Sequence, residues 1–131
     1  MTKSLTNINV LDFSHALSGP FCSMLLAELG AKIIKIEPPH GDHFRPANGG
    51  ATFAVVNRNK RSLCLDLKQP SASIIMERLI SKCDVILENF TPGTMERLGY
   101  HYEALKKMKP DIIYASISGF GSTGPYKDLK G

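Results

Sequence analysis

The sequence predicts an α/β fold, in which a parallel β-sheet carries helices on both of its faces. Short apolar runs rich in β-branched residues alternate along the chain with segments whose apolar residues have helical spacing. The predicted strands are apolar at most positions, which is typical of parallel strands buried on both faces. The chain has 131 residues, of which 43% are hydrophobic, so it is long enough for one domain with a real core.

Five strands are expected, each followed by a helix, a turn or a loop. The first helix is bracketed by Pro20, which suits a first helical turn, and Gly30, which suits a left-handed helix end. Residues 37–50 are rich in Pro, Gly and Asn, and we expect them to form a long surface loop. The expected strands are residues 8–13, 32–36, 63–67, 84–88 and 111–117. The expected helices and helical turn are residues 21–29, 70–83, 91–99 and 102–108.

The last fourteen residues, 118–131, are Gly-rich and contain no expected helix or strand. A parallel sheet of this kind is normally continued by a further crossover after such a loop. We therefore expect residues 1–131 to be the amino-terminal part of a larger domain, with a second domain absent from the chain.

Composition excludes several classes of protein. No stretch approaches the length of a membrane span, and the polar start leaves no room for a signal peptide, so a cytoplasmic protein without a membrane partner is expected. Three cysteines without a C-x-x-C pair predict neither a disulfide framework nor a zinc site. The net charge of +4 suits a phosphate-bearing ligand, whereas no signature of nucleic-acid binding is present.

Two motifs are weaker than they first look. Residues 119–124 read G-x-G-x-x-G, but the dinucleotide fingerprint belongs to the first strand-to-helix turn, and only seven residues follow it here. His40, Asp42 and His43 carry metal-ligating groups, yet no further convincing ligand lies nearby, and a solvated loop without metal is expected.

Several side chains point to an anion site at one edge of the sheet. His15 lies in the first strand-to-helix turn, at the carboxyl end of a strand, where α/β proteins place their ligands. A helix-entry residue bonded to the backbone is the structural alternative. Lys68, Arg97 and Lys130 follow different strands, so they are expected to converge on a pyrophosphate, although a solvated basic face fits the composition equally well.

The chain resembles the class III coenzyme A transferases, which include carnitine-CoA transferase, formyl-CoA transferase and 2-methylacyl-CoA racemase. The likeness spans nearly the whole chain and rests on the order and spacing of its segments. These are Val10-Leu11-Asp12-Phe13-Ser14, Gly19-Pro20-Phe21, Leu29-Gly30-Ala31, Ile34-Lys35-Ile36-Glu37-Pro38, residues 57–63, Leu65-Asp66-Leu67-Lys68, Asp84-Val85, Glu88-Asn89-Phe90, Pro92-Gly93, Leu98-Gly99 and residues 116–121.

The resemblance implies a Rossmann-like domain that binds the nucleotide end of coenzyme A (CoA), within a longer chain that forms an interlocked homodimer. It implies an acyl-CoA and a carboxylic acid as substrates, and CoA as the bound carrier. By matching position, the residues implied to contact CoA are His15, Ala16, Leu65, Lys68, Asn89, Phe90, Arg97 and Lys130.

The resemblance also implies catalysis through an aspartyl-CoA thioester. The nucleophilic Asp of the family is expected beyond Gly131, so this chain alone is expected to bind CoA weakly and not to catalyse transfer. Leu17 stands where the formyl-CoA branch has Gln, which argues against oxalate as the acceptor. A racemase of the same fold, a non-catalytic CoA- or nucleotide-binding module and, third, an NAD oxidoreductase are the alternatives.

Overall fold

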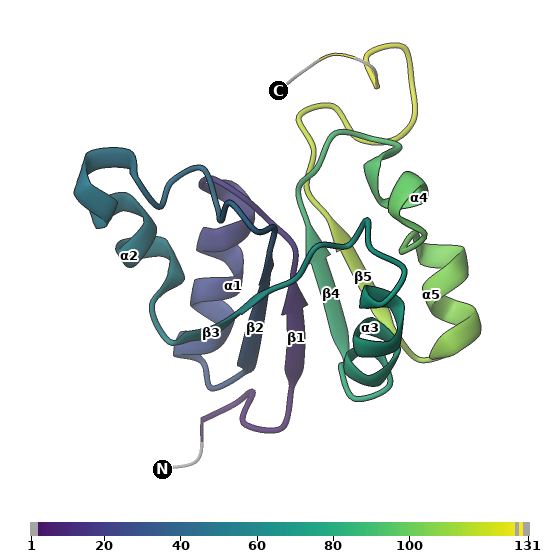
Figure 1. Ribbon diagram of the computed structural model, residues 1–131, viewed down its shortest axis with the longest axis horizontal. Coiled ribbons are helices and arrows are strands. Elements are labelled where there is room, and N and C mark those ends of the chain that lie inside the picture. Colours follow the sequence, from purple (N-terminus) through teal and green to yellow (C-terminus); the bar gives the residue numbers. More distant parts are fainter. Residues whose placement is uncertain (1–2, 128, 130–131) are drawn as a thin grey trace.

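A five-stranded parallel sheet forms the centre of the molecule (Figure 1). The structure is a computed structural model that describes residues 3–127 and 129. The strand order is β3-β2-β1-β4-β5, so the chain first winds outward in one direction from β1 and then in the other from β4. The strands are β1 (Asn9–Asp12), β2 (Lys32–Glu37), β3 (Lys60–Cys64), β4 (Val85–Glu88) and β5 (Ile113–Ser116). The predicted α/β class and parallel sheet are confirmed.

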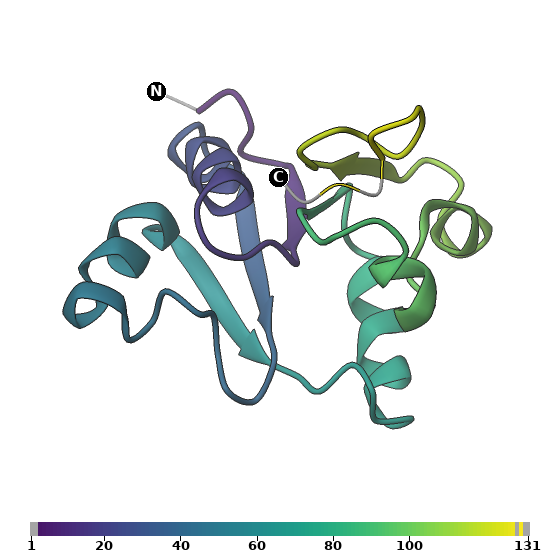
Figure 2. The same ribbon diagram turned by 90° about the horizontal axis from the view of Figure 1, so that it is seen from above.

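Helices cover both faces of the sheet, as the sequence predicts (Figures 1 and 2). On one face α1 packs over the central strands with α2 beside it, and on the other face lie α3, α4 and α5. The helices are α1 (Ser18–Glu28), α2 (Ala51–Asn57), α3 (Ala72–Ile80), α4 (Thr94–Leu98) and α5 (Tyr102–Met108), and a short 3-10 turn η1 (Ala47–Gly50) precedes α2.

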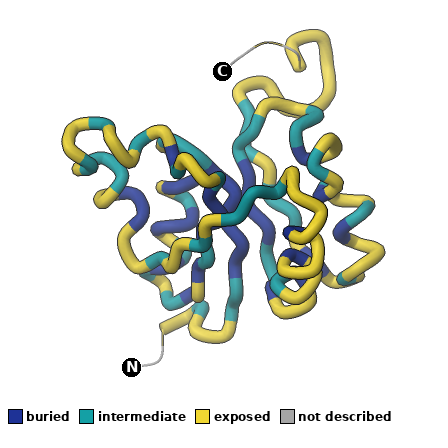
Figure 3. Tube along the Cα trace, viewed as in Figure 1, coloured by how far each residue is buried: buried dark blue, intermediate teal, exposed yellow. Residues whose placement is uncertain are grey.

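The alternation of side chains along the strands divides the core into two. Leu11 and Ile86 point toward α3, α4 and α5, whereas their neighbours Val10 and Leu87 point toward α1. All four are almost completely buried, and the buried colour in Figure 3 is concentrated on these central strands. A strand that is apolar on both faces therefore holds the two helical layers together.

Three local predictions differ from the structure. The third strand is predicted at residues 63–67, but β3 begins at Lys60, whose ammonium group is buried against Asp12 of β1. The predicted surface loop 37–50 contains Asp42, which is buried and paired with Lys35. Helix α2 is not expected from the sequence, because its Thr, Phe and Val residues have low helix propensity and it depends on tertiary contacts, among them packing against α1. No helix in the described part of the chain is long and apolar enough to cross a membrane.

Candidate functional site

The carboxyl ends of β1, β2, β3 and β4 meet at one edge of the sheet, and the loops that follow them form the candidate site. The first loop connects β1 to α1 and carries His15, and the last follows β4 and carries Asn89 and Phe90. β1 and β4 are neighbours although two strands separate them in sequence, so the sheet changes winding direction between them. Ligands of open α/β sheets bind at such a switch point.

A cavity of about 160 Å³ lies between these loops. Four residues that the sequence singles out line it together, and they come from three separate loops: His15, Leu65, Lys68 and Phe90. Its walls are mainly apolar, with the ammonium side chain of Lys68 as the cationic group. The remaining lining residues are Phe13, Ile36, Pro38, Asp66, Leu67 and Leu98.

Two aromatic side chains define the wall nearest to β4. The imidazole of His15 meets the ring of Phe90 edge-on, with the ring centroids 4.7 Å apart. Burial, followed by the charge of Lys35, lowers the pKa of His15 below its ordinary value. His15 is therefore neutral at pH 7 and can donate one hydrogen bond and accept another.

Phe90 belongs to a second cavity as well. This cavity has a volume of about 530 Å³, and Ser18, Asn89 and Lys127 are among the residues that line it. An elongated ligand that passes Phe90 would therefore touch both spaces.

Asn89 holds the turn that carries His15. Its side-chain Oδ1 accepts from the His15 backbone N–H at 2.8 Å, and its Nδ2 donates to the His15 carbonyl at 2.9 Å. The same Nδ2 lies 3.2 Å from the hydroxyl of Ser18 at the start of α1. The side chain of Asn89 thus ties the loop after β4 to the loop after β1.

Ala16, the next residue of this turn, has a φ of 59°. This left-handed conformation costs a residue with a Cβ atom about 1 kcal/mol, so the surrounding contacts must hold it.

The predicted convergence of cations is only partly visible. Lys68 lines the smaller cavity, whereas Arg97 is exposed on α4, next to the cavity residue Leu98, and donates to the Thr94 hydroxyl at 2.7 Å. Lys130 lies outside the described residues. The pyrophosphate site therefore stays a prediction.

A buried network of charges beneath the site was missed by sequence reasoning. Asp12, Lys35, Glu37, Asp42 and Lys60 are all at least about nine-tenths buried in their side chains, and each is paired. Burial alone would raise the pKa of Glu37, but hydrogen bonds from Arg45, Ser62 and the Asp42 N–H outweigh it and lower the pKa to about 2. The sequence offers one sign of this network, because several of these charged residues stand at the ends of otherwise apolar strands.

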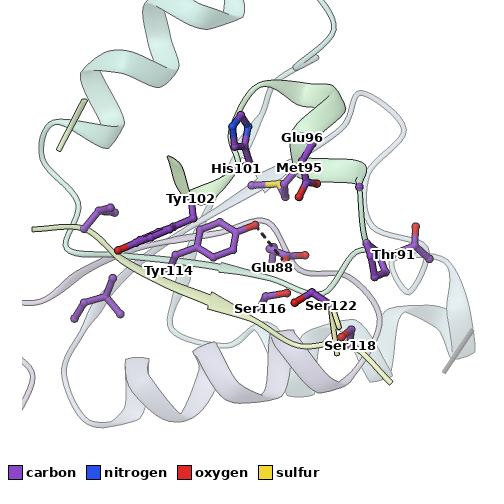
Figure 4. Close-up of a pocket in the computed structure, with 14 residues that line it drawn as sticks. Glu88, Thr91, Met95, Glu96, His101, Tyr102, Tyr114, Ser116, Ser118 and Ser122 are labelled. Atoms are coloured by element: carbon purple, nitrogen blue, oxygen red, sulfur yellow. Dashed lines mark hydrogen bonds between the residues drawn. The ribbon is translucent and has the colours of Figure 1, made fainter. Parts of the chain in front are cut away.

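A further cavity, of about 610 Å³, lies elsewhere, between β5, α4 and α5 (Figure 4). Tyr114 donates to Glu88 Oε1 at 3.3 Å within it, and burial, followed by the Glu88 carboxylate, raises the pKa of Tyr114 well above its ordinary value. His101, Tyr102 and Glu96 complete its polar lining. Of the predicted site residues that the structure describes, none lines this cavity.

The fingerprint segment 119–124 does not begin a helix. Bends and turns follow β5 as far as Lys127. Its context therefore differs from that of a dinucleotide-binding turn. Within the same described range, no group of three His, Cys, Asp or Glu side chains is arranged to hold a metal ion.

The fold is that of an α/β protein whose parallel sheet changes winding direction between β1 and β4, with cavities among the loops at that point. The model of CoA-transferase family III matches residues 5–131, and the chain belongs to this family. The resemblance inferred from the sequence is thereby confirmed.

Three relatives illustrate the match. The chain is 46% identical over 137 aligned residues to a formyl-CoA:oxalate CoA-transferase of Bradyrhizobium diazoefficiens, covering 99% of the chain and 32% of the relative. A CAIB/BAIF family protein from Brucella suis superposes with a TM-score of 0.95 at 35% identity, covering 100% of the chain and 37% of that protein. A hypothetical protein from Mycobacterium tuberculosis gives a TM-score of 0.94 at 39% identity, covering 98% and 36%. The chain thus spans about a third of the length of these relatives.

Proposed function

We propose that residues 1–131 form the amino-terminal part of the CoA-binding domain of an enzyme that transfers CoA from an acyl-CoA to a carboxylic acid. The observation that carries this proposal is the grouping of His15, Leu65, Lys68 and Phe90 around one cavity at the switch point. Membership of CoA-transferase family III supports it, as do the relatives that are named formyl-CoA:oxalate CoA-transferases.

Each part of the cavity suits a part of CoA. The apolar walls formed by Leu65 and Phe90 match the faces of an adenine ring, which stack on apolar and aromatic side chains. The ammonium group of Lys68 at this site suits a phosphate, and Arg97 and Lys130 are proposed as its partners. Because Phe90 borders both cavities, we propose that the pantetheine arm passes it on the way to the larger one.

The proposed chemistry is covalent. An Asp carboxylate attacks the acyl-CoA thioester, the CoA thiolate leaves, and a mixed anhydride forms on the Asp. The thiolate then attacks the aspartyl carbonyl and releases the first acid, and the acceptor carboxylate completes the exchange by the reverse steps. The liberated thiolate must stay close between the steps, which a firmly held nucleotide end provides.

We assign the nucleophile to none of the 131 residues, and we expect no transfer by this chain alone. Leu17 is 54% exposed at the start of α1 and presents an apolar side chain there. We therefore propose a less polar acceptor acid than oxalate.

The test is an NMR titration of the ¹⁵N-labelled 131-residue chain with CoA up to millimolar concentration. We expect saturable shifts of the amides of His15, Leu65 and Phe90. Lys68→Ala should weaken binding about fivefold, because one charge-assisted contact to phosphate contributes about 1 kcal/mol. Lys32→Ala is the matched control, since Lys32 is exposed at the opposite, amino-terminal end of β2.

Shifts confined to other surfaces, or equal weakening by Lys32→Ala, would contradict the proposed site. NADH, titrated in parallel, shares the adenine and pyrophosphate groups but lacks the pantetheine arm, so we expect it to shift the same amides and to bind more weakly than CoA. Stronger binding of NADH than of CoA would favour a nicotinamide-dependent oxidoreductase instead.

A further inference from the structure

We infer that Lys35 and Asp42 are positioning residues for CoA binding: their buried ion pair holds the His15–Ala16 turn in the shape that presents His15 to the cavity. The inference rests on the proposed function, and it assigns a role to two residues that touch neither of the cavities around Phe90.

The pair lies directly beneath the turn. Lys35 comes from the middle of β2 and Asp42 from the loop after β2, and their side chains are 1% and 0% exposed. Lys35 Nζ lies 2.9 Å from Asp42 Oδ2 and donates to the backbone carbonyl of Ser14 at 2.5 Å. The Asp42 carboxylate in turn accepts from the backbone N–H of Phe44 at 2.9 Å, and the nearby Ala16 N–H helps to lower the pKa of Asp42.

The contacts of the turn divide cleanly between two sources. Asn89 binds both backbone groups of His15, while Lys35 of the ion pair donates to the Ser14 carbonyl directly before it. Ala16 is held at a φ of 59°, a conformation that persists only where its surroundings enforce it. Without the pair, the turn loses the buried contact at the Ser14 carbonyl, and Ala16 can relax toward an ordinary φ.

Stability alone explains this pair poorly. Two charges buried in a protein gain little net stability over apolar residues of similar volume, because the cost of desolvation offsets their attraction. An ion pair that holds the backbone in one conformation next to a ligand has a role that an apolar pair could not fill.

A neighbouring pair offers a matched comparison. Lys60 Nζ lies 3.0 Å from Asp12 Oδ2, and the two side chains are 2% and 0% exposed. Lys60 also donates to the Pro20 carbonyl at 2.8 Å and to Asn57 Oδ1 at 2.9 Å, so it fastens the start of α1 and the end of α2. It is equally buried but makes no contact with the His15 and Ala16 backbone.

The experiment compares the double variant Lys35→Met/Asp42→Asn with wild type and with Lys60→Met in the 131-residue chain. The double variant leaves no unpaired charge buried, so it should fold. We expect its CoA affinity, measured by NMR titration, to fall about tenfold, since one to two buried contacts of the turn are lost. The three-bond HN–Hα coupling of Ala16 should change as well, because its φ is no longer held at 59°.

Lys60→Met should lower the melting temperature, because it leaves the Asp12 carboxylate buried without its cation. CoA affinity should stay within about twofold of wild type, because Lys60 itself fastens helices, while Asp12 keeps its hydrogen bond from the Ser14 N–H at 2.9 Å. Unchanged affinity and unchanged Ala16 coupling in the double variant would overturn the inference, as would an equal loss of affinity in Lys60→Met. If wild type itself fails to bind CoA, the proposed function fails. The Ala16 coupling then decides the positioning role on its own.

Discussion

At the scale of single residues, the most unusual feature of this protein is the group of charges buried beneath the edge of the sheet that carries the candidate site. Glu37 is the clearest case, because its carboxylate accepts from Arg45 Nε and Nη2, from the Ser62 hydroxyl, each at 2.6 Å, and from the Asp42 N–H at 3.1 Å. A carboxylate with this many donors is stabilised in its charged form. It joins β2, β3 and the loop after β2 at a single point.

Glu37→Gln should therefore destabilise the protein in a pH-dependent way. The pKa of Glu37 falls from 4.5 to about 2 on folding, so its stabilising effect is complete above pH 4.5 and disappears as the pH falls toward about 2. At pH 7 the variant should lose about 2 kcal/mol of unfolding free energy, the scale of hydrogen bonds to a charged group. Urea unfolding followed by circular dichroism between pH 3 and 7 measures the difference.

The control for this prediction is Glu28→Gln. Glu28 pairs with Arg58 at 2.8 Å, but the two side chains are 39% and 50% exposed, and solvent weakens such a pair. Its loss should be small at every pH. A Glu37→Gln loss that is equally large at pH 3 and pH 7 would show that the lowered pKa is not its source.

Sequence reasoning found residues of the candidate site but not the buried residues that hold them in place. His15, Leu65, Lys68 and Phe90 are brought to one cavity, and their role as CoA contacts stays a prediction. The ion pair of Lys35 and Asp42 escaped notice, because nothing in a sequence shows that a lysine within an apolar strand has a buried partner.

At the scale of elements, the start of α1 is the best-defined feature. The helix begins three residues before the predicted position, so that Gly19 lies in its first turn against the β1–α1 loop. A Cβ atom at Gly19 would lie 2.2 Å from Ser14 Cβ and 3.2 Å from Asn89 Cγ. This close approach, rather than an unusual φ, requires glycine.

Gly19→Ala should consequently displace Ser14 and disturb the turn that carries His15. We expect a loss of about 2 kcal/mol of unfolding free energy, as for other overpacked positions, together with shifted amides of His15 and Ala16. Thermal unfolding and an NMR spectrum of the variant check both effects. Ser18→Ala is the control, because it removes one 3.2 Å hydrogen bond and adds no atom; a Gly19→Ala variant as stable as Ser18→Ala would contradict the packing argument.

The prediction from the sequence failed for the elements whose local residue pattern is weak. α5 was predicted at residues 102–108 and spans Tyr102–Met108, because its pattern is plain. α2 was missed and β3 was displaced, because their formation depends on α1 and on the burial of Lys60 against Asp12. Local propensity yields to such tertiary contacts.

On the scale of the whole molecule, one sheet contributes side chains to two hydrophobic cores, one on each of its faces. Ile86 is fully buried on the side of α3 to α5, and Leu87 is 2% exposed on the side of α1. Because adjacent residues of one strand belong to different cores, the two should unfold together.

Ile86→Ala and Leu87→Ala should each cost about 2 to 5 kcal/mol through the cavity that they leave. Urea unfolding should remain a single transition, with tyrosine fluorescence and circular dichroism coinciding, since Tyr100 is buried in the core beneath α3 to α5 and reports on that side. Ile74→Ala, at a side chain 58% exposed, should change little. Separate transitions in Leu87→Ala would instead indicate two independent units.

The sequence by itself determined the class of fold, the number of its strands and the family, because periodicity, turn residues and segment order are local properties of the chain. The tertiary structure alone decided which loops meet, which charges are buried and how the His15 turn is held. The reason is that these features join residues separated by up to 75 positions, such as Asn9 and Asp84, and proximity of that kind arises only when the sheet assembles.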